Sequence, residues 1–442
     1  MEVDFLLINP WIYDFSAYDF WLKPYGLLYI GGKLRKLGYK LYYLDLLDPF
    51  NKDLPKAPKR REFGTGHFYK EPVPKPYFFQ DVPRRFYRYG LPFKVFKHKI
   101  SGLKFKAVLL TCTLTYWYPG LFSVLNFLAK NYSKIPIYIG GIYPKLCKEH
   151  LAEFLSQYKD LEVYVVTQND TEFLTHIKSR FLPSGETFPN EYPIFDLQTQ
   201  IPYVVLMTSL GCPFNCPYCA SKRIYPSYQE KSPEEVWEEV LFWHQNYGVK
   251  DFAFYDDALL FNFEKRLKPF LEKVISSGLH LRFHTPNAVH ARFINQEVAL
   301  LLKQAGFTTI RLGLERVENR FDQKVNLDEF LEAVSYLKKA GFSPKELGAY
   351  LLYGIPEENF KEVEKAIYFL EKVEISPYLA EFSPIPGTPF FEMAKAVSRY
   401  KIEEDPIFHN NSIFPVLKNP NWEEIERIKG LAKAVRQRLT SL

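Results

Sequence analysis

The sequence predicts an α/β protein in which a Rossmann-like, doubly wound parallel sheet precedes a partial (β/α)6 barrel of the TIM type. Short apolar runs alternate with helical segments along two long stretches, and a proline-rich connector separates the two. The 442 residues, 47% of them hydrophobic, are enough to build two cores. We therefore assign residues 1–182 to the first domain, 183–202 to a linker, 203–395 to the barrel and 396–442 to a C-terminal helical extension.

The first stretch has the strand and helix order of a parallel sheet, with Gly38 ending its first helix. Strands are expected at 3–10, 39–46, 106–115, 135–141 and 161–168, and helices at 25–37, 120–132 and 146–158. Ligands bind such sheets at the carboxyl ends of the strands. Those ends carry the segments "NP" (9–10), "TLTYWYPG" (113–120), "GGIYP" (140–144) and "TQND" (167–170).

The second stretch repeats a strand and a helix, as in a partial barrel. Ser232 is expected to cap the first helix, since Glu235 follows three residues later. Strands are expected at 203–211, 251–257, 279–287, 308–315, 346–356 and 378–387; helices at 232–248, 295–306, 327–341 and 360–373, with another ending near 277 and a closing one within 419–439. In such barrels the chemistry lies at the C-terminal ends of the strands.

Three of the five cysteines, Cys212, Cys216 and Cys219, fall close together in "GCPFNCPYC". The two prolines of this loop keep it from becoming helical, and thiols so close in sequence do not suit a disulfide framework. Structural zinc takes four ligands, and a [4Fe-4S] cluster normally takes four cysteines. Three thiolates therefore favour a cluster with one open iron, where a small molecule binds. A zinc site completed by a histidine, or plain core thiols, is the alternative.

The composition indicates a soluble, cytoplasmic protein. The formal net charge of +6 is mild for this length. No uninterrupted apolar run reaches the roughly eighteen residues of a membrane span, and "MEVDFLLINPWIYDF" has acidic residues where a signal peptide begins with basic ones. We find no dedicated RNA-binding module, so nucleic acid is not the favoured partner.

Residues 51–106 form a basic, aromatic insertion, with fifteen Lys and Arg against four Asp and Glu. Arg84, Arg85 and Arg88 would hold a small-molecule substrate that is anionic or lipid-like, since guanidinium groups pair well with anions. A solvated basic surface is the alternative interpretation. An anionic lipid surface is a further partner that this charge allows.

The spacing C-x3-C-x2-C after the first strand of a (β/α) barrel resembles the radical S-adenosylmethionine (SAM) superfamily. The resemblance implies that Cys212, Cys216 and Cys219 hold a [4Fe-4S] cluster. It also implies that the amino and carboxylate groups of SAM occupy the fourth iron. An electron from the cluster then cleaves SAM, and the 5′-deoxyadenosyl radical abstracts a hydrogen from the substrate.

Further residues at the strand ends of the barrel extend this resemblance and are implied to contact SAM. It places the aromatic Tyr218 and the fifth-strand turn at Gly354 and Ile355 near the adenine. It places Asp256 and Asp257 at the ammonium of SAM, and the fourth-strand residues Arg311 and Glu315 near the ribose or methionine. A core tyrosine, a helix N-cap for one aspartate and a surface ion pair for Arg311 are the alternatives.

A parallel α/β domain before such a barrel resembles the cobalamin (vitamin B12)-dependent branch of the superfamily. The resemblance implies a set of corrin-lining residues: Asn9, Pro10, Tyr25, Gly26, Thr113, Thr115, Tyr116, Gly140, Gly141 and Tyr143. The two adjacent glycines would let the ring approach the backbone, although a tight turn explains them as well. Cys112 would face the corrin or be a buried thiol, and Cys147 is expected to be a buried thiol.

Two departures from that branch bear on cobalamin. No histidine lies two residues after an aspartate, so the D-x-H-x-x-G motif with its axial histidine is absent, and "VVTQND" (165–170) replaces an acidic G-E-G-E turn. Either the cobalt has no histidine ligand or the domain has lost the cofactor.

The resemblance favours an oxygen-sensitive enzyme that uses a [4Fe-4S] cluster, SAM and cobalamin to methylate an unactivated carbon of a small molecule. A flavodoxin or ferredoxin would supply electrons. A radical SAM cyclase or oxidative rearrangement enzyme is the second interpretation, and a metal-stabilised binding protein without turnover is the third. Substrate identity and oligomeric state are not readable from the sequence.

Overall fold

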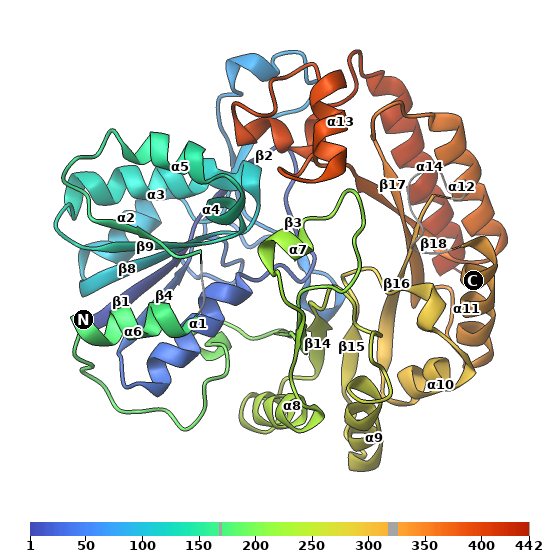
Figure 1. Cartoon of the computed structure of the whole chain (residues 1–442), viewed down its shortest axis with the longest axis horizontal. Coiled ribbons are helices and arrows are strands. Elements are labelled where there is room, and N and C mark those ends of the chain that lie inside the picture. The colour runs from blue at the N-terminus through green and yellow to red at the C-terminus, as the bar shows by residue number, and fades with distance from the viewer. Residues whose placement is uncertain (168–169, 317–325, 442) are drawn as a thin grey trace. The chain divides into compact units, whose positions relative to one another are not determined.

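A computed structural model describes residues 1–167, 170–316 and 326–441 and confirms the α/β fold (Figure 1). Gln168 and Asn169, part of the expected strand end "TQND", lie outside the described residues. The chain forms two compact units, one of Met1–Ile201 with Ile402–Ile413 and the other of Pro202–Lys401 with Phe414–Leu442. The expected C-terminal extension, 396–442, is therefore divided between the two units.

The first unit contains a parallel sheet of order β10-β9-β8-β1-β4. Its strands are β1 (Glu2–Asn9), β4 (Leu41–Asp45), β8 (Lys104–Cys112), β9 (Ile137–Gly141) and β10 (Val163–Val165). In Figure 1 one face carries α1 (Tyr25–Lys36) and α6 (Asp170–Arg180), and the other carries α2 (Phe93–Ser101), α3 (Tyr118–Asn131) and α5 (Lys148–Leu155); α4 (Ile142–Leu146) follows β9. The chain changes direction across the sheet between β1 and β8, where such folds bind ligands.

The basic insertion is folded rather than irregular. It contributes two strands to the antiparallel sheet of β2 (Ile12–Asp14), β7 (Tyr87–Tyr89) and β6 (Lys70–Pro72), and one strand to the pair β3 (Tyr18–Asp19) and β5 (Gly66–His67). The whole of α2 also lies within it. Ile12, Leu47, Phe68 and Tyr89 form a buried apolar cluster in this region. The aromatic residues of the insertion thus serve packing as well as its surface.

The segment Ile402–Ile413 belongs to the first unit through buried polar contacts. His409 Nδ1 lies 3.0 Å from Thr115 Oγ1, and its Nε2 lies 2.8 Å from the carbonyl oxygen of Ile402. Asn410 Nδ2 donates to Asp14 Oδ1 at 2.9 Å. Burial lowers the pKa of His409 to about 4, so this imidazole is neutral at pH 7.

Replacing His409 by glutamine is expected to change how stability depends on pH. The folded-state pKa lies below the unfolded value of about 6.5, so the unfolded chain binds more protons between pH 4 and 6.5. Acidification therefore removes about 1.4 kcal/mol of the His409 contribution per pH unit in that window, about 3 kcal/mol in all. Asp14 and Asp45, whose pKa values burial raises to about 6, act in the opposite direction in both proteins.

Urea unfolding of wild type and His409→Gln from pH 7 to pH 4 isolates the histidine, because the two aspartates cancel in the difference. A difference in unfolding free energy that stays constant across this range would contradict the prediction.

The second unit contains six parallel strands in the order of their sequence, as predicted for a partial barrel. They are β11 (Val204–Leu206), β14 (Asp251–Phe254), β15 (Arg282–His284), β16 (Phe307–Glu315), β17 (Leu347–Tyr353) and β18 (Ser376–Glu381). The helices are α8 (Pro233–Tyr247), α9 (Leu267–Ser277), α10 (Gln296–Gln304), α11 (Leu327–Lys339), α12 (Phe360–Lys372), α13 (Pro389–Val397) and α14 (Trp422–Thr440). The predicted capping box of Ser232 and Glu235 opens α8.

Five of the six barrel strands are shorter than expected. The second, third and fifth end at Phe254, His284 and Tyr353 rather than at 257, 287 and 356. The first strand, expected at 203–211, ends at Leu206, and β12 (Ser209–Leu210) instead pairs antiparallel with β13 (Gln229–Glu230). The sixth ends at Glu381 rather than 387, because Pro384 and Pro386 have no N–H for a strand ladder.

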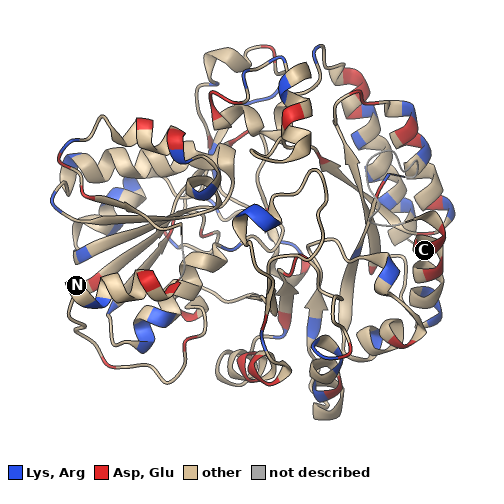
Figure 2. Cartoon of the chain, viewed as in Figure 1, with Lys and Arg blue, Asp and Glu red and all other residues tan. Residues whose placement is uncertain are grey.

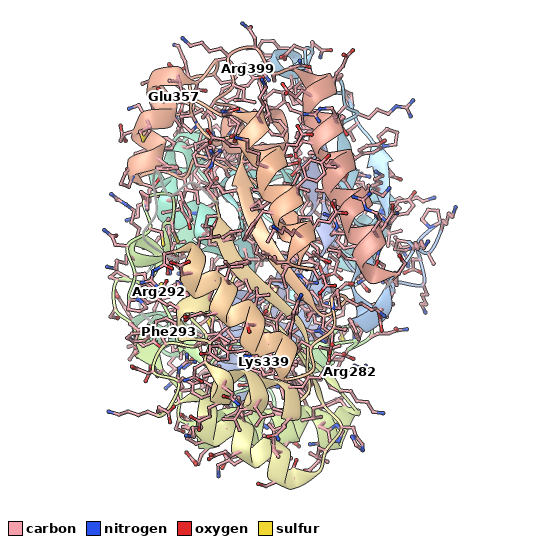
Figure 3. The ribbon with its side chains drawn as sticks, turned by 90° about the vertical axis from the view of Figure 1, so that its right-hand side faces the viewer. Arg282, Arg292, Phe293, Lys339, Glu357 and Arg399 are labelled. Atoms are coloured by element: carbon pink, nitrogen blue, oxygen red, sulfur yellow. The ribbon has the colours of Figure 1, made fainter. Side chains whose placement is uncertain are left out.

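Charged residues cover the outer helices of the second unit (Figure 2, and with all side chains in Figure 3). Ion pairs join α14 to α12, as between Arg427 and Glu364 at 2.9 Å. Such exposed pairs each contribute less than about 1 kcal/mol to stability.

Among the helices of the described residues, none combines the length and apolar character needed to cross a bilayer.

Candidate functional site

The cysteine loop lies between β12 and the short helix α7 (Ser221–Ile224). It begins at Gly211, whose φ of +81° and close approach to the carbonyl of Ser227 leave no comfortable room for a side chain. Cys212 and Cys216 are half-buried and Cys219 is exposed. The N–H of Cys219 donates to the carbonyl of Cys216 at 3.1 Å, which closes a turn between two of the three thiols.

The donor set of this loop fits an iron-sulfur cluster. All five cysteines are thiols rather than disulfides, and three soft thiolates on one short loop suit a cluster with an open iron. Within the described ranges, no three His, Cys, Asp or Glu side chains already stand together as a metal site. The assignment of Cys212, Cys216 and Cys219 to a cluster therefore remains a prediction from their chemistry and spacing.

The loop is tied to the N-terminus of α13. The N–H of Phe390 donates to the carbonyl of Pro217 at 3.1 Å. The half-buried Tyr218 ring meets the Phe390 ring edge-on, with 6.0 Å between centroids. Thr388 caps α13 by accepting the N–H of Phe391 at 3.2 Å. Tyr218 is thus placed beside the cysteines, and its contact with adenine stays a prediction.

Asp256, which is expected at the SAM ammonium, has partners within the protein. Its side chain is 0% exposed and forms a 3.1 Å ion pair with Arg266. It also accepts hydrogen bonds from Thr208 and Ser209. Asp257, by contrast, is exposed and accepts a 2.5 Å hydrogen bond from the Ser221 hydroxyl. The contacts of Asp256 and Asp257 with the SAM ammonium stay predictions.

Arg311 lies in the interior of the second unit, and the surface ion pair considered for it is wrong. It is 4% exposed. Its guanidinium donates to the carbonyls of Ile310 and Glu346 and to the Tyr378 hydroxyl. No carboxylate of the described residues forms an ion pair with it. Glu315, with a φ of +59°, is half-buried at the end of β16. SAM contacts of these two residues stay predictions.

The turn after β17 is held by a buried carboxylate that the sequence did not single out. Glu358 accepts the N–H groups of Gly354, at 2.6 Å, and Ile355, at 3.3 Å. Its side chain is 0% exposed and is ion-paired with Arg316. Gly354 has a φ of +75°, and a Cβ there would lie 2.9 Å from the ring of Phe414. The turn expected near the adenine is therefore rigidly shaped, and its role in SAM binding stays a prediction.

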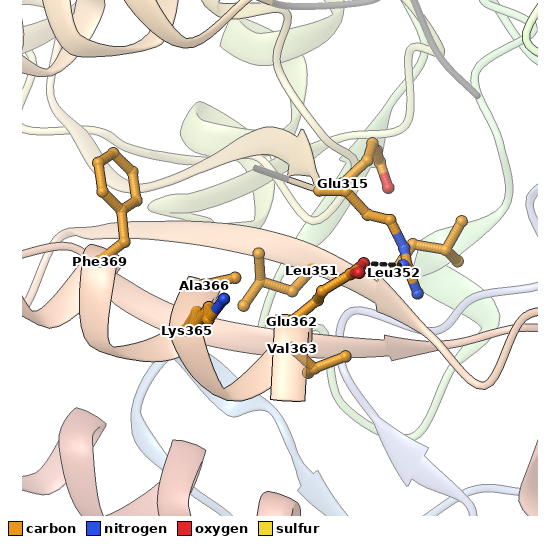
Figure 4. Close-up of a pocket in the computed structure, with 9 residues that line it drawn as sticks. Glu315, Leu351, Leu352, Glu362, Val363, Lys365, Ala366 and Phe369 are labelled. Carbon is orange, nitrogen blue, oxygen red and sulfur yellow. Dashed lines mark hydrogen bonds and ion pairs between the residues drawn. The ribbon is translucent and has the colours of Figure 1, made fainter. Parts of the chain in front are cut away.

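A cavity of about 220 Å³ lies between β17 and α12 (Figure 4). Glu315 and Arg316 are among its charged residues, and its apolar lining is Leu351, Leu352, Val363, Ala366 and Phe369. Glu362 pairs with Arg316 there at 3.4 Å. The cavity has no lining residue from the cysteine loop among those described, so we do not assign it to the chemistry.

The residues expected to line a corrin divide into two groups. The first group is buried: Asn9, Pro10, Thr115, Tyr116 and Tyr143. Asn9 donates to Asp45 at 2.8 Å, and the Tyr143 hydroxyl lies 2.7 Å from His150 Nδ1. Because the residues of this group are buried, their side chains have little exposed surface against which a corrin ring could pack in this structure. Their cobalamin contacts remain predictions.

The second group, Tyr25, Gly26, Thr113, Gly140 and Gly141, is at least partly exposed. A Cβ on Gly26 would meet nothing within 4 Å, and one on Gly140 would meet only the carbonyl of Val166 at 3.9 Å. These two positions leave open space of the kind that a flat ring could use. Gly141, with a φ of +106°, instead packs against the backbone of Cys112, as a tight turn requires.

The other polar residues expected near a ligand have structural contacts. Arg88 is ion-paired with Glu71 and lies over the Trp11 ring, and Arg84 donates to the carbonyl of Ser412 at 3.3 Å. Arg85 is exposed, so it is the one of these three arginines that fits the alternative interpretation of a solvated basic surface. Cys112 and Cys147 are buried, and burial raises the pKa of both thiols, as expected of core cysteines.

Sequence reasoning missed Arg266 and Glu358, which hold the ends of two barrel strands. Their signal was weak, because each is a single charged residue in a segment where charges are common. Only the burial of their side chains distinguishes them.

Residues 206–370 match the Radical SAM superfamily model. The uncharacterized methyltransferase PH0819 of Pyrococcus horikoshii is 32% identical over 204 residues, which cover 44% of this chain and 43% of that protein. Bacteriochlorophyllide d C-12(1)-methyltransferase of Chlorobaculum tepidum is 24% identical over 202 residues, covering 43% and 42%. The matches thus span less than half the length of these curated relatives.

Among solved structures, the radical SAM methyltransferase TsrM of Kitasatospora setae is similar along 90% of this chain. The form with tryptophan and the SAM analogue aza-SAM covers 77% of that chain with a TM-score of 0.63, and the form with cobalamin and a [4Fe-4S] cluster covers 78% with 0.62. At 14% identity these matches show a common fold. The region that matches the Radical SAM superfamily model, residues 206–370, includes the cysteine loop at the end of the first barrel strand.

Proposed function

We propose that this protein is a radical SAM enzyme that methylates an unactivated carbon with the help of cobalamin. The observation that carries the proposal is the loop of Cys212, Cys216 and Cys219, which lies at the carboxyl end of the first barrel strand within the matched region. When bound, the cluster supplies the electron that cleaves SAM, and cobalamin supplies the methyl group.

The chain's own residues would bind and orient these groups. The three thiolates would hold three irons and leave the fourth to SAM. The contact between Pro217 and Phe390 fixes the loop against α13, and the turn at Gly354 is fixed by Glu358. Because these contacts are made within the protein, they would set the position of SAM before it binds.

Cobalamin is supported by three observations. TsrM, which shares the fold, has been solved with cobalamin, and two similar proteins are named methyltransferases. Gly26 and Gly140 leave open space in the first unit.

The substrate would be a small molecule and the electron donor a flavodoxin or ferredoxin. The five thiols fit a reducing compartment such as the cytoplasm.

Anaerobic reconstitution with iron, sulfide and cobalamin tests this proposal. We expect about four irons per chain and one bound corrinoid. With a strong reductant, SAM and candidate substrates, we expect both 5′-deoxyadenosine and S-adenosylhomocysteine. 5′-Deoxyadenosine without S-adenosylhomocysteine would indicate cyclisation or oxidation instead. Neither product, from protein with a full cluster, would overturn the enzyme proposal.

A further inference from the structure

We propose that Arg266 is a positioning residue that fixes the segment before the cysteine loop, at Thr208 and Ser209. Its side chain is 2% exposed and lies just before α9, outside the segments that the cluster motif covers. The guanidinium is ion-paired with Asp256 and donates to the Thr208 hydroxyl. This inference rests on the proposed cluster role of the loop.

Asp256 joins the segments that follow two neighbouring strands, β11 and β14. It follows β14, and it accepts the N–H of Thr208 at 3.1 Å and the hydroxyls of Thr208 and Ser209, each at 2.6 Å. Thr208 and Ser209 stand between β11 and Gly211, where the cysteine loop begins. The first thiol, on Cys212, is therefore only three residues from Ser209 and four from Thr208 along the chain.

Arg266 also fixes the segment that follows Asp256. It donates to the carbonyls of Ala258, at 3.2 Å, of Leu259, and of Phe261, at 3.0 Å. A planar guanidinium reaches these acceptors at fixed angles, whereas an ammonium on a flexible stem does not. One buried arginine thus holds the segments that follow two neighbouring strands, β11 and β14, where the cysteine loop leaves the barrel.

The consequence concerns geometry rather than overall folding. Displacing a binding group by about 1 Å is enough to lower rates about a hundredfold. If Thr208 and Ser209 shift, the three thiolates shift with them. The cluster can still form, because thiolate ligands tolerate small movements, but the open iron and the SAM contacts of the barrel no longer match.

The variant Arg266→Lys keeps the charge and removes the planar fork. Its matched control is Arg282→Lys, because Arg282 (labelled in Figure 3) pairs with Asp251 through two contacts of 2.6 and 2.5 Å at the opposite end of β14. We expect both variants to bind iron as wild type does. In Arg266→Lys alone, SAM should bind the cluster about tenfold more weakly or worse, measured by its change of the electron paramagnetic resonance spectrum of the reduced cluster.

A measurement without the cluster accompanies this test. Amide hydrogen exchange of residues 207–220 in the apoprotein should accelerate in Arg266→Lys and not in Arg282→Lys. If Arg266→Lys does not fold, Thr208→Val takes its place. It removes one hydroxyl, which donates to Asp256 and accepts from Arg266, and should cause a smaller change in the same direction.

The inference is overturned if Arg266→Lys, or Thr208→Val in its place, binds SAM within about twofold of wild type and exchanges at the wild-type rate. Failure of the proposed function looks different. Wild-type protein would then take up no cluster, or would show no spectral response to SAM.

Discussion

Cys216→Ala is expected to reduce formation of 5′-deoxyadenosine by about a thousandfold or more, because two thiolates do not hold a cubane with a single open iron. The overall fold should persist. The side chain is only half-buried in a loop, and substitutions at such positions usually change stability by less than about 1 kcal/mol. Iron content after anaerobic reconstitution and product formation with reductant and SAM measure the two effects.

Cys147→Ala provides the control for this experiment. Cys147 is a buried thiol of the first unit that caps α5 by its backbone and has no expected role in a cluster. It should retain about four irons per chain and wild-type turnover. A Cys216→Ala protein that also keeps its full iron content and its turnover would show that the cluster assignment is wrong.

Glu358→Gln is expected to destabilise the protein by about 3 kcal/mol, because it removes the charge of a carboxylate that is 0% exposed and leaves Arg316, among the described residues, with only the longer pair to Glu362, at 3.4 Å. It also weakens the acceptor for the N–H groups of Gly354 and Ile355. Since that turn is expected to lie near the adenine, SAM affinity should fall as well. Urea unfolding measures the first effect and equilibrium binding of SAM to the reconstituted protein measures the second.

Glu362→Gln is the matched control. Glu362 pairs with the same Arg316 at 3.4 Å, but its side chain is 16% exposed, so its loss should change the unfolding free energy by less than about 1 kcal/mol. Equal destabilisation by the two variants would refute the claim that Glu358 stabilises the fold more than Glu362 does.

The strand and helix order was predictable because it follows local patterns. Buried apolar runs and amphipathic segments repeat with their own periods, and the capping box at Ser232 needs only four consecutive residues. The boundaries were less predictable. β11 ends at Leu206 because Thr208 and Ser209 bind Asp256, which lies 48 and 47 residues away, and no local pattern contains that information.

The candidate site divides in the same way. The three cysteines were identified because metal-ligand spacing is a short-range feature of the chain. The roles expected of Asp256 and Arg311 depended on what their side chains meet. Both are buried and bonded within the second unit, to Arg266 in one case and to Tyr378 in the other.

The sequence by itself determined the class of fold, the resemblance to the radical SAM superfamily and the positions of the three thiols, because each of these depends on residue types at short, fixed spacing. Only the tertiary structure decided which charges are buried, that Arg266 and Glu358 hold the ends of two barrel strands, and that Ile402–Ile413 belongs to the first unit. The physical reason is that ion pairing and burial depend on partners far apart along the chain, and these meet only when it folds.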